Sequence, residues 1–252
     1  TRSNVVNAPM LSVNNSVFDI RGIAFKNLPH SGASENYFID LLSSGTANIQ
    51  QCFFCTNVSG NTSTLTQNDI GGIQAQGGNI NISNNLFCGS TFISAYPGSS
   101  ANISNNFFGT NYSGTASTFP NVPNSPACFV GTNTGVNSAV VSSNLFFNFF
   151  GKGLYFSVNG TTPNNVSLSY NYFNVNSNGS DLGLTLAGTI GMHVENSSNY
   201  TNAVQVGNNL FAGLNKAYSQ NGSSAKAPIL AITYPASAFG TNSLAYRHFA
   251  TS

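Results

Sequence analysis

Charge is the scarcest property of this 252-residue chain. Only 5% of its residues are charged, against roughly 25% in an ordinary soluble domain, and Trp is absent. A run of 82 residues, from Ile70 to Gly151, contains no Asp, Glu, Lys or Arg. Seven scattered cations make no basic surface, which excludes nucleic-acid binding by phosphate neutralisation. No run of about 18 apolar residues exists that would span a membrane.

Apolar and amide side chains are abundant instead. Hydrophobic residues make up 40% of the chain and aromatic residues 12%, including 20 Phe, which excludes a disordered chain. The chain also contains 39 Asn. Helical i, i+3, i+4 spacing is almost absent, whereas short apolar–polar alternations recur, as they do in half-buried strands. The composition and the pattern therefore predict an all-β fold.

A short motif repeats along the chain. Its clearest copies are Ile82–Phe87 (ISNNLF), Ile103–Phe108 (ISNNFF) and Val206–Phe211 (VGNNLF). Each copy follows a second short apolar run, and clusters of Gly, Ser, Asn and Pro separate the runs. The intervals between copies vary, which argues against propeller blades and favours a parallel β-helix, where loops leave between coils without disturbing the stack.

These copies resemble the repeat of the right-handed, pectate-lyase-like parallel β-helix superfold, over about residues 16–249. The resemblance implies a single-domain right-handed solenoid, and the repeat count predicts about eight coils. We expect an N-terminal extended segment at residues 1–15 and the β-helix domain at residues 16–252. The right hand also follows from the general rule for parallel crossover connections.

The repeat predicts two ladders inside the rod. One Phe from each copy is expected to stack on the next, giving a ladder of Phe25, Phe54, Phe87, Phe108, Phe146, Phe173, Phe211 and Phe249. The residue two before the Phe is Asn in five consecutive copies: Asn85, Asn106, Asn144, Asn171 and Asn209. We expect these Asn to bridge successive coils through their amides and to adopt the left-handed backbone of a sharp turn. The other copies depart from the pattern, with Ile23, Cys52 and Arg247 at that position.

Four cysteines fit neither a zinc site nor a thioredoxin-like motif. Cys55 follows Phe54 and Cys88 follows Phe87, so both occupy the same position of the coil. If those coils are adjacent, their Cα atoms lie within disulfide range, and we predict a Cys55–Cys88 bridge. Cys52 and Cys128 would remain as a possible second pair. The alternative is four buried free thiols, which pack as small apolar residues.

Twelve N-x-[ST] sequons make N-linked glycans a further possibility. Composition alone accounts for roughly nine of them, so the excess is small. A chain this poor in charge nevertheless needs another source of hydration at an extracellular surface, and glycans would supply it. The sequon residues are Asn14, Asn57, Asn61, Asn81, Asn102, Asn111, Asn159, Asn165, Asn178, Asn196, Asn199 and Asn221.

Few residues are available for catalysis. The β-helix resemblance implies polysaccharide-cutting enzymes such as pectate lyases and polygalacturonases, whose chemistry needs clustered acids. Only six acids occur here, and none forms a D-x-D or D-D pair. The best catalytic candidates are Asp181, His193 and Glu195, since the latter two share one expected strand face. A purely structural interpretation of this trio is favoured, and we expect no metal and no cofactor.

Three functions remain open on the sequence alone. The first is an extracellular structural protein, a self-assembling β-solenoid subunit of a filament, sheath or surface coat, whose partner is another copy of itself. It is favoured because residues 1–15 contain no amphipathic helix to cap the sheet edges and the repeat continues almost to the C-terminus. The second is a cell-surface adhesin or binding domain. The third is a polysaccharide lyase or hydrolase on the same fold.

Overall fold

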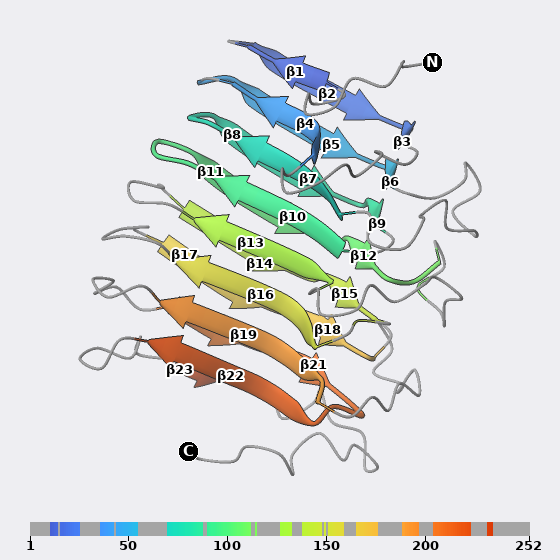
Figure 1. The fold of residues 1–252 in the computed structure, drawn as a ribbon, viewed down its shortest axis with the longest axis vertical. Helices are drawn as coiled ribbons and strands as arrows, with labels where there is room; N and C mark the ends of the chain where they lie inside the picture. The colour runs from blue at the N-terminus through green and yellow to red at the C-terminus, as the bar shows by residue number, and fades with distance from the viewer. Residues whose placement is uncertain are drawn as a thin grey trace.

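The computed structural model is a rod of stacked β-coils whose strands run across the rod axis (Figure 1). The N-terminal coils lie at one end and the C-terminal coils at the other. The structure describes residues 11–14, 16–25, 36–42, 44–54, 70–87, 90–111, 114, 127–132, 138–147, 149, 151–158, 165–175, 188–196, 204–222 and 231–233.

Three parallel sheets make up the described part of the chain. Sheet A contains β1 (Leu11–Val13), β4 (Asn36–Leu41), β7 (Ile70–Ala75), β10 (Ser90–Ala95), β13 (Cys128–Thr132), β16 (Lys152–Val158), β19 (Ile190–Asn196) and β22 (Lys216–Gly222). Sheet B contains β2 (Val17–Arg21), β5 (Thr46–Gln50), β8 (Asn79–Ser83), β11 (Ser100–Ser104), β14 (Ser138–Ser142), β17 (Asn165–Ser169), β20 (Val204–Gly207) and β23 (Ala231–Thr233). Sheet C contains the two-residue strands β3 (Ala24–Phe25), β6 (Phe53–Phe54), β9 (Leu86–Phe87), β12 (Phe107–Phe108), β15 (Leu145–Phe146), β18 (Tyr172–Phe173) and β21 (Leu210–Phe211).

Neighbouring strands within a sheet are three apart in chain order, so each consecutive set of three strands forms one coil. Coil 1 is β1–β3, coil 2 is β4–β6, and the series continues to coil 7, β19–β21; β22 and β23 belong to coil 8. This arrangement confirms the all-β parallel solenoid of about eight coils. The first strand lies at Leu11–Val13, within the segment expected to be extended, and pairs with β4.

Apolar–polar alternation places sheet B against the core. In β8, Ile80 and Ile82 are fully buried, whereas Asn79, the first residue of the strand, is exposed and Asn81 is half-buried. In β11, Ala101 and Ile103 are buried in the same way, and Ile82 pairs directly with Ile103. A shift of one residue would expose every one of these apolar groups, so the pattern fixes the register.

Seven Phe side chains stack along the interior. Neighbouring rings from Phe25 to Phe211 have centroids 4.5–4.9 Å apart and interplanar angles of 3–11°. The ring spacing matches the distance between strands, about 4.8 Å, because each ring belongs to one coil. Phe249, the eighth expected member, lies outside the described residues. The ladder fills the core beside sheet C and ties each coil to the next.

The corner between sheets B and C turns through a left-handed residue, one position before the place expected. Gly22, Gln51, Asn84, Asn105, Ser143, Tyr170 and Asn208 occupy this position in coils 1–7, with φ of 55–67°. The expectation that the Asn ladder itself adopts this conformation is therefore wrong. The ladder side chains point inward from the next residue, where they are buried, while the residue before them, exposed or half-buried, makes the bend.

The Asn ladder is a continuous set of buried amide hydrogen bonds. The Oδ1 of Asn144 accepts from both the backbone N and the Nδ2 of Asn106, each at 3.0 Å. Its own Nδ2 donates to the Ile103 carbonyl at 2.9 Å and to the Oδ1 of Asn171 at 3.0 Å. The same scheme recurs from Asn85 to Asn209. Each amide from Asn85 to Asn171 thus bridges three coils, and Asn209 bridges two.

Cys52 occupies the ladder position in coil 2. Its backbone N donates to the Oδ1 of Asn85 at 2.9 Å, as the backbone N of each ladder residue from Asn85 to Asn171 does toward the next coil. Its Sγ lies 3.7 Å from the Ile20 carbonyl, in the place where an Asn would present Nδ2. Burial raises the pKa of this thiol, so it remains protonated and serves as a weak donor.

Replacing Cys52 with Asn is expected to stabilise the protein. The amide would add a second donor toward Asn85 and a stronger donor toward Ile20, a gain of about 0.5–1.5 kcal/mol in the free energy of unfolding. Urea unfolding of Cys52→Asn beside Cys52→Ala measures the effect. A Cys52→Asn variant no more stable than Cys52→Ala would contradict the ladder role of this position.

The possible pairing of Cys52 with Cys128 is wrong, because both are buried free thiols. Cys52 lies at the corner between sheets B and C in coil 2, whereas Cys128 lies in sheet A in coil 5. Three coil steps separate them by about 14 Å along the rod, well beyond disulfide range. Cys128 faces the core, where burial raises its pKa.

The expected bridge between Cys55 and Cys88 falls on residues outside the described part, and it stays a prediction. The preceding residues, Phe54 and Phe87, are direct partners in adjacent coils. We expect alkylation in denaturant to modify two more thiols after reduction than before it, as read from the intact mass. Equal modification with and without reductant would exclude the bridge.

Candidate functional site

The outer face of sheet A brings together several titratable and nucleophilic side chains. Tyr155 in β16, His193 in β19 and Ser219 in β22 are direct partners across three neighbouring strands. Glu195 lies two residues after His193 and therefore on the same face of β19. Lys152 begins β16, and its Nζ lies 3.9 Å from the centroid of the Tyr155 ring.

His193 is at the centre of this cluster and is only 4% exposed. Its Nδ1 lies 2.6 Å from the Oγ of Ser219, a hydrogen bond whose direction follows the tautomer of the ring. Its ring meets the Tyr155 ring edge to face, with centroids 5.1 Å apart. Burial, together with the positive charge of Lys152, lowers the pKa of His193 to about 4. The ring is therefore neutral at pH 7.

The sequence-predicted trio is only partly placed. His193 and Glu195 share a strand face as expected, whereas Asp181 lies outside the described residues. Lys152, Tyr155 and Ser219 were not among the predicted site residues. Tyr155 had a usable signal, because it and His193 each lie 18 residues before the ladder Phe of their own coil.

The residues of this cluster could support only a few kinds of chemistry. A neutral His beside a Ser hydroxyl is the arrangement in which the imidazole removes the hydroxyl proton during nucleophilic attack. Burial lowers the pKa of Lys152, while the nearby Glu195 carboxylate opposes that shift. Within the described residues, no group of three His, Cys, Asp or Glu side chains is close enough to hold a metal ion.

The free energy of unfolding should fall as the pH decreases from 6.5 towards about 4 through His193. The unfolded chain takes up a proton at the ordinary pKa of 6.5, whereas the folded chain resists protonation down to about 4. In this window the unfolded state binds more protons, so acid destabilises the fold. Burial raises the pKa of Asp40, despite its hydrogen bond from Gln76, and that group acts in the opposite direction.

The contribution of His193 to the pH dependence of stability is therefore measured by comparing the native protein with a variant that lacks the imidazole. Urea midpoints of the native protein and His193→Gln at pH 7 and at about pH 4.5 provide it. The native protein should lose more stability on acidification than the variant. Equal losses would show that His193 is not held neutral by the fold.

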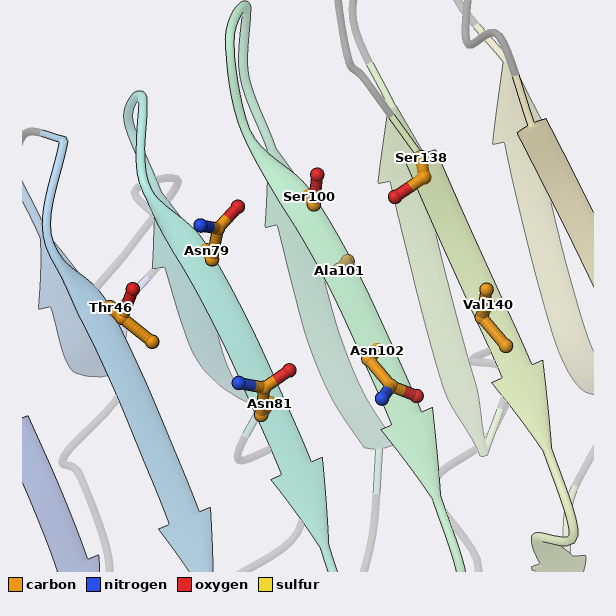
Figure 2. Close-up of a pocket in the computed structure, with 8 residues that line it drawn as sticks. All are labelled: Thr46, Asn79, Asn81, Ser100, Ala101, Asn102, Ser138 and Val140. Atoms are coloured by element: carbon orange, nitrogen blue, oxygen red, sulfur yellow. The ribbon is translucent and has the colours of Figure 1, made fainter.

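Sheet B presents a different outer face, composed of three columns of uncharged side chains over β5, β8, β11 and β14. The first column is Thr46, Asn79, Ser100 and Ser138; the second is Asn48, Asn81, Asn102 and Val140; the third is Gln50, Ser83, Ser104 and Ser142. In Figure 2 the labelled side chains of the first two columns rise from four adjacent strands on one side of the sheet. They line a shallow trough of about 360 Å³.

An amide row extends the second column toward the N-terminal coil. The Nδ2 of Asn81 donates to the Oδ1 of Asn48 at 2.8 Å, and the Nδ2 of Asn48 donates to the Oδ1 of Asp19 at 2.7 Å. Asn102, the next member, is exposed. The row repeats on the surface the interstrand amide bonding that the buried ladder makes inside.

The two outer faces differ in accessibility. Asp40, Gln74, Ser94 and Ser157 lie on the outer side of sheet A, yet each is only 5–8% exposed. On sheet B the outward residues are exposed or half-buried, and Val17 in β2 is 75% exposed. These positions of sheet A are therefore covered, although Ser12 on the same face is exposed and Tyr155 and Glu195 are half-buried, whereas sheet B is an open surface.

The structure describes the side chains of four of the twelve sequon Asn residues. Asn14 and Asn102 are exposed, and Asn81 and Asn111 are half-buried. Three others lie in strands but their side chains are not described: Asn165, Asn196 and Asn221. The remaining five lie outside the described residues: Asn57, Asn61, Asn159, Asn178 and Asn199. Asn102 is thus an exposed acceptor in the middle of the open sheet.

Comparisons with protein-family models, with curated proteins and with solved structures found no match. In the described part of the chain, no helix has the length and apolar character needed to cross a membrane. Function must therefore be argued from the faces of the rod themselves.

Proposed function

We propose that this chain is an extracellular structural protein: a self-assembling β-solenoid subunit of a filament, sheath or surface coat. The open, uncharged outer face of sheet B carries the proposal. Charged residues are among the features that keep exposed sheets of soluble monomers from associating. From coil 3 to coil 5 this chain has none, because the 82-residue uncharged run covers those coils. Such a surface suits a subunit that is packed against neighbours.

The internal ladders support the same role. Stacked rings link coils 1–7 and bridged amides link coils 3–7, so most of the rod is held together by the same contacts at each coil step. In the described residues, β1 and β22 are the outermost strands of sheet A, and β2 and β23 are the outermost strands of sheet B. A strand that bounds a parallel sheet offers backbone groups to a further strand. A second copy, whose strands have the same spacing, is suited to continue both sheets end to end.

The extracellular location rests on the low charge and the sequons. Glycans on exposed acceptors such as Asn14 would hydrate a surface that lacks charge. Intact mass before and after enzymatic removal of N-glycans from native material tests this part of the proposal. A mass unchanged by the treatment, and equal to that of the bare chain, would remove glycans from the account.

Negative-stain microscopy of the native material, and of the purified chain at increasing concentration, tests the assembly. We expect rods that lengthen with concentration in steps of one subunit. Discrete particles of constant length at high concentration would contradict a self-assembling subunit.

A polysaccharide lyase or hydrolase is the second candidate, favoured by the contact between His193 and Ser219 beside Glu195. Its test is cleavage of acidic and neutral polysaccharides by the native chain and by Glu195→Gln. Cleavage that is lost in the variant would place the enzyme ahead of the structural subunit. Absence of cleavage on both classes of polymer would leave the cluster a structural feature of sheet A.

A further inference from the structure

We propose that the outer face of sheet B, formed by the three outward columns of β5, β8, β11 and β14, is the docking surface for the same face of a second copy. This inference deepens the proposed function, since it names the partner and the face through which copies associate side by side. It is independent of the end-to-end contact, which involves the terminal coils. The two contacts together would produce a sheath or bundle.

The chemistry of the face is self-complementary. In a two-fold interface each patch meets itself, so each group must be able to pair with its own kind. Amides and hydroxyls both donate and accept, and the surface pair Asn48–Asn81 already forms such a bond within one copy. A face with charge of one sign would repel its own copy. The columns over β5, β8, β11 and β14 carry no charged side chain.

The period of the face also selects a second copy over a foreign polymer. Side chains in each column repeat at the strand spacing, about 4.8 Å, and an identical face repeats at the same distance. Two copies therefore stay in register over any number of coils. A polymer with another repeat would lose register after a few coils, so its contacts would not accumulate along the rod.

The area of the face predicts how strong the contact is. Five-residue strands about 16 Å long, spaced about 4.8 Å apart over the four strands of the face, give roughly 300 Å² per copy, or about 600 Å² for a pair. Stable interfaces bury about 1,200–2,000 Å², so single subunits should pair weakly. Subunits joined end to end present a longer face, and the pairing of two such rods strengthens through multivalency.

Asn102 is the residue that tests the docking surface most directly. It lies in the central column of the face, it is exposed, and it lines the trough (Figure 2). It is also a sequon, and a glycan there would hold a second copy away from the sheet. Occupancy of Asn102 by a glycan in native material would therefore overturn the docking surface.

Small-angle X-ray scattering distinguishes the two kinds of association. We would measure the purified chain over roughly 10 µM to 1 mM, the range in which weak interfaces dissociate. Side-by-side pairing enlarges the cross-section and leaves the maximum dimension almost unchanged, whereas end-to-end assembly lengthens the rod at constant cross-section. Growth of the cross-section supports the docking surface. Growth in length alone supports the proposed function and overturns the docking surface, and constancy of both dimensions overturns both.

Asn102→Lys is the test variant, and Asn215→Lys is its matched control at an exposed position between β21 and β22. Two facing lysines at the interface should weaken side-by-side pairing by at least about tenfold, and the control should leave it unchanged. Equal melting temperatures would show that both variants fold. Unchanged pairing in Asn102→Lys would overturn the docking surface. So would binding of a soluble neutral polysaccharide to the native chain, abolished in Asn102→Lys, without any growth of the cross-section.

Discussion

Replacing Asn144 with Ala is expected to lower the free energy of unfolding by roughly 2–6 kcal/mol. The substitution leaves the buried N–H of Asn106 without its acceptor at 3.0 Å. It also removes the amide bonds to the Ile103 carbonyl and to Asn171. An unpaired buried donor costs about 1–3 kcal/mol, and each further bond that is lost costs about 0.5–1.5 kcal/mol. This loss is a large share of the stability of an ordinary domain, about 5–15 kcal/mol.

Alanine substitutions at two other Asn residues provide controls for the stability loss in Asn144→Ala. Asn209 is the last described member of the ladder and donates to the Leu168 carbonyl, with no further described ladder residue beyond it. Asn209→Ala should therefore cost less than Asn144→Ala. Asn215→Ala, at an exposed position, should change stability by no more than about 0.5 kcal/mol. Urea unfolding of the three variants orders them, and an Asn144→Ala variant as stable as Asn215→Ala would contradict the internal ladder.

Replacing Phe108 with Ala is expected to cost about 3–5 kcal/mol through the loss of a fully buried ring. Phe108 stacks on Phe87 at 4.8 Å and on Phe146 at 4.9 Å, so its removal opens a cavity and ends both ring contacts. Because each coil touches only its neighbours, the gap also uncouples the two halves of the ladder. The unfolding transition should therefore broaden as well as shift.

Phe107 provides the matched control on the same strand. Its ring is only half-buried, and no ring stacking with Phe87 or Phe146 involves it. Phe107→Ala removes the same atoms from the neighbouring position of β12 and should cost clearly less than Phe108→Ala. Calorimetry and urea unfolding of both variants measure the difference. Equal losses, with the native transition width retained in each, would show that the stacked ring has no special part in joining coils.

The part of the fold nearest the repeat was accessible from the sequence. The I-x-N-N-x-F motif covers the strand of sheet B, the corner and the strand of sheet C, where the alternation of apolar and polar residues fixes which side chains face inward. The left-handed corner residue was misplaced by one position. Four of the seven corner residues are Gly or Asn, which adopt this backbone readily, whereas Gln51, Ser143 and Tyr170 have no such preference, so residue type identifies the bend only in part.

Sheet A was harder to anticipate, and so was the cluster on its outer face. Loops of variable length separate its strands from the repeat, and an irregularity between Tyr37 and Ile39 breaks the alternation in β4. The contact of His193 with Ser219 depends on the register between β19 and β22, which no sequence pattern fixed. The burial of Asp40 likewise depends on what covers the sheet, which alternation along one strand does not reveal.

The contrast between the two outer faces clarifies the meaning of the uncharged run. Low charge alone predicted a surface without electrostatic protection. The structure shows that this chemistry lies on an open, regular sheet whose side chains both donate and accept hydrogen bonds. The same residue types that make the internal Asn ladder cohesive thus occur on the surface where we place the contact between copies.

Cryo-electron microscopy of the native material, read through the power spectrum of the assembled particles, tests the central claim most directly. A filament of β-solenoids stacked end to end predicts a reflection at about 4.8 Å along the filament axis, because the strands lie across the rod and succeed one another at that spacing. Discrete particles, or filaments whose 4.8 Å reflection lies across the axis, would contradict the assembly of this chain as a structural subunit.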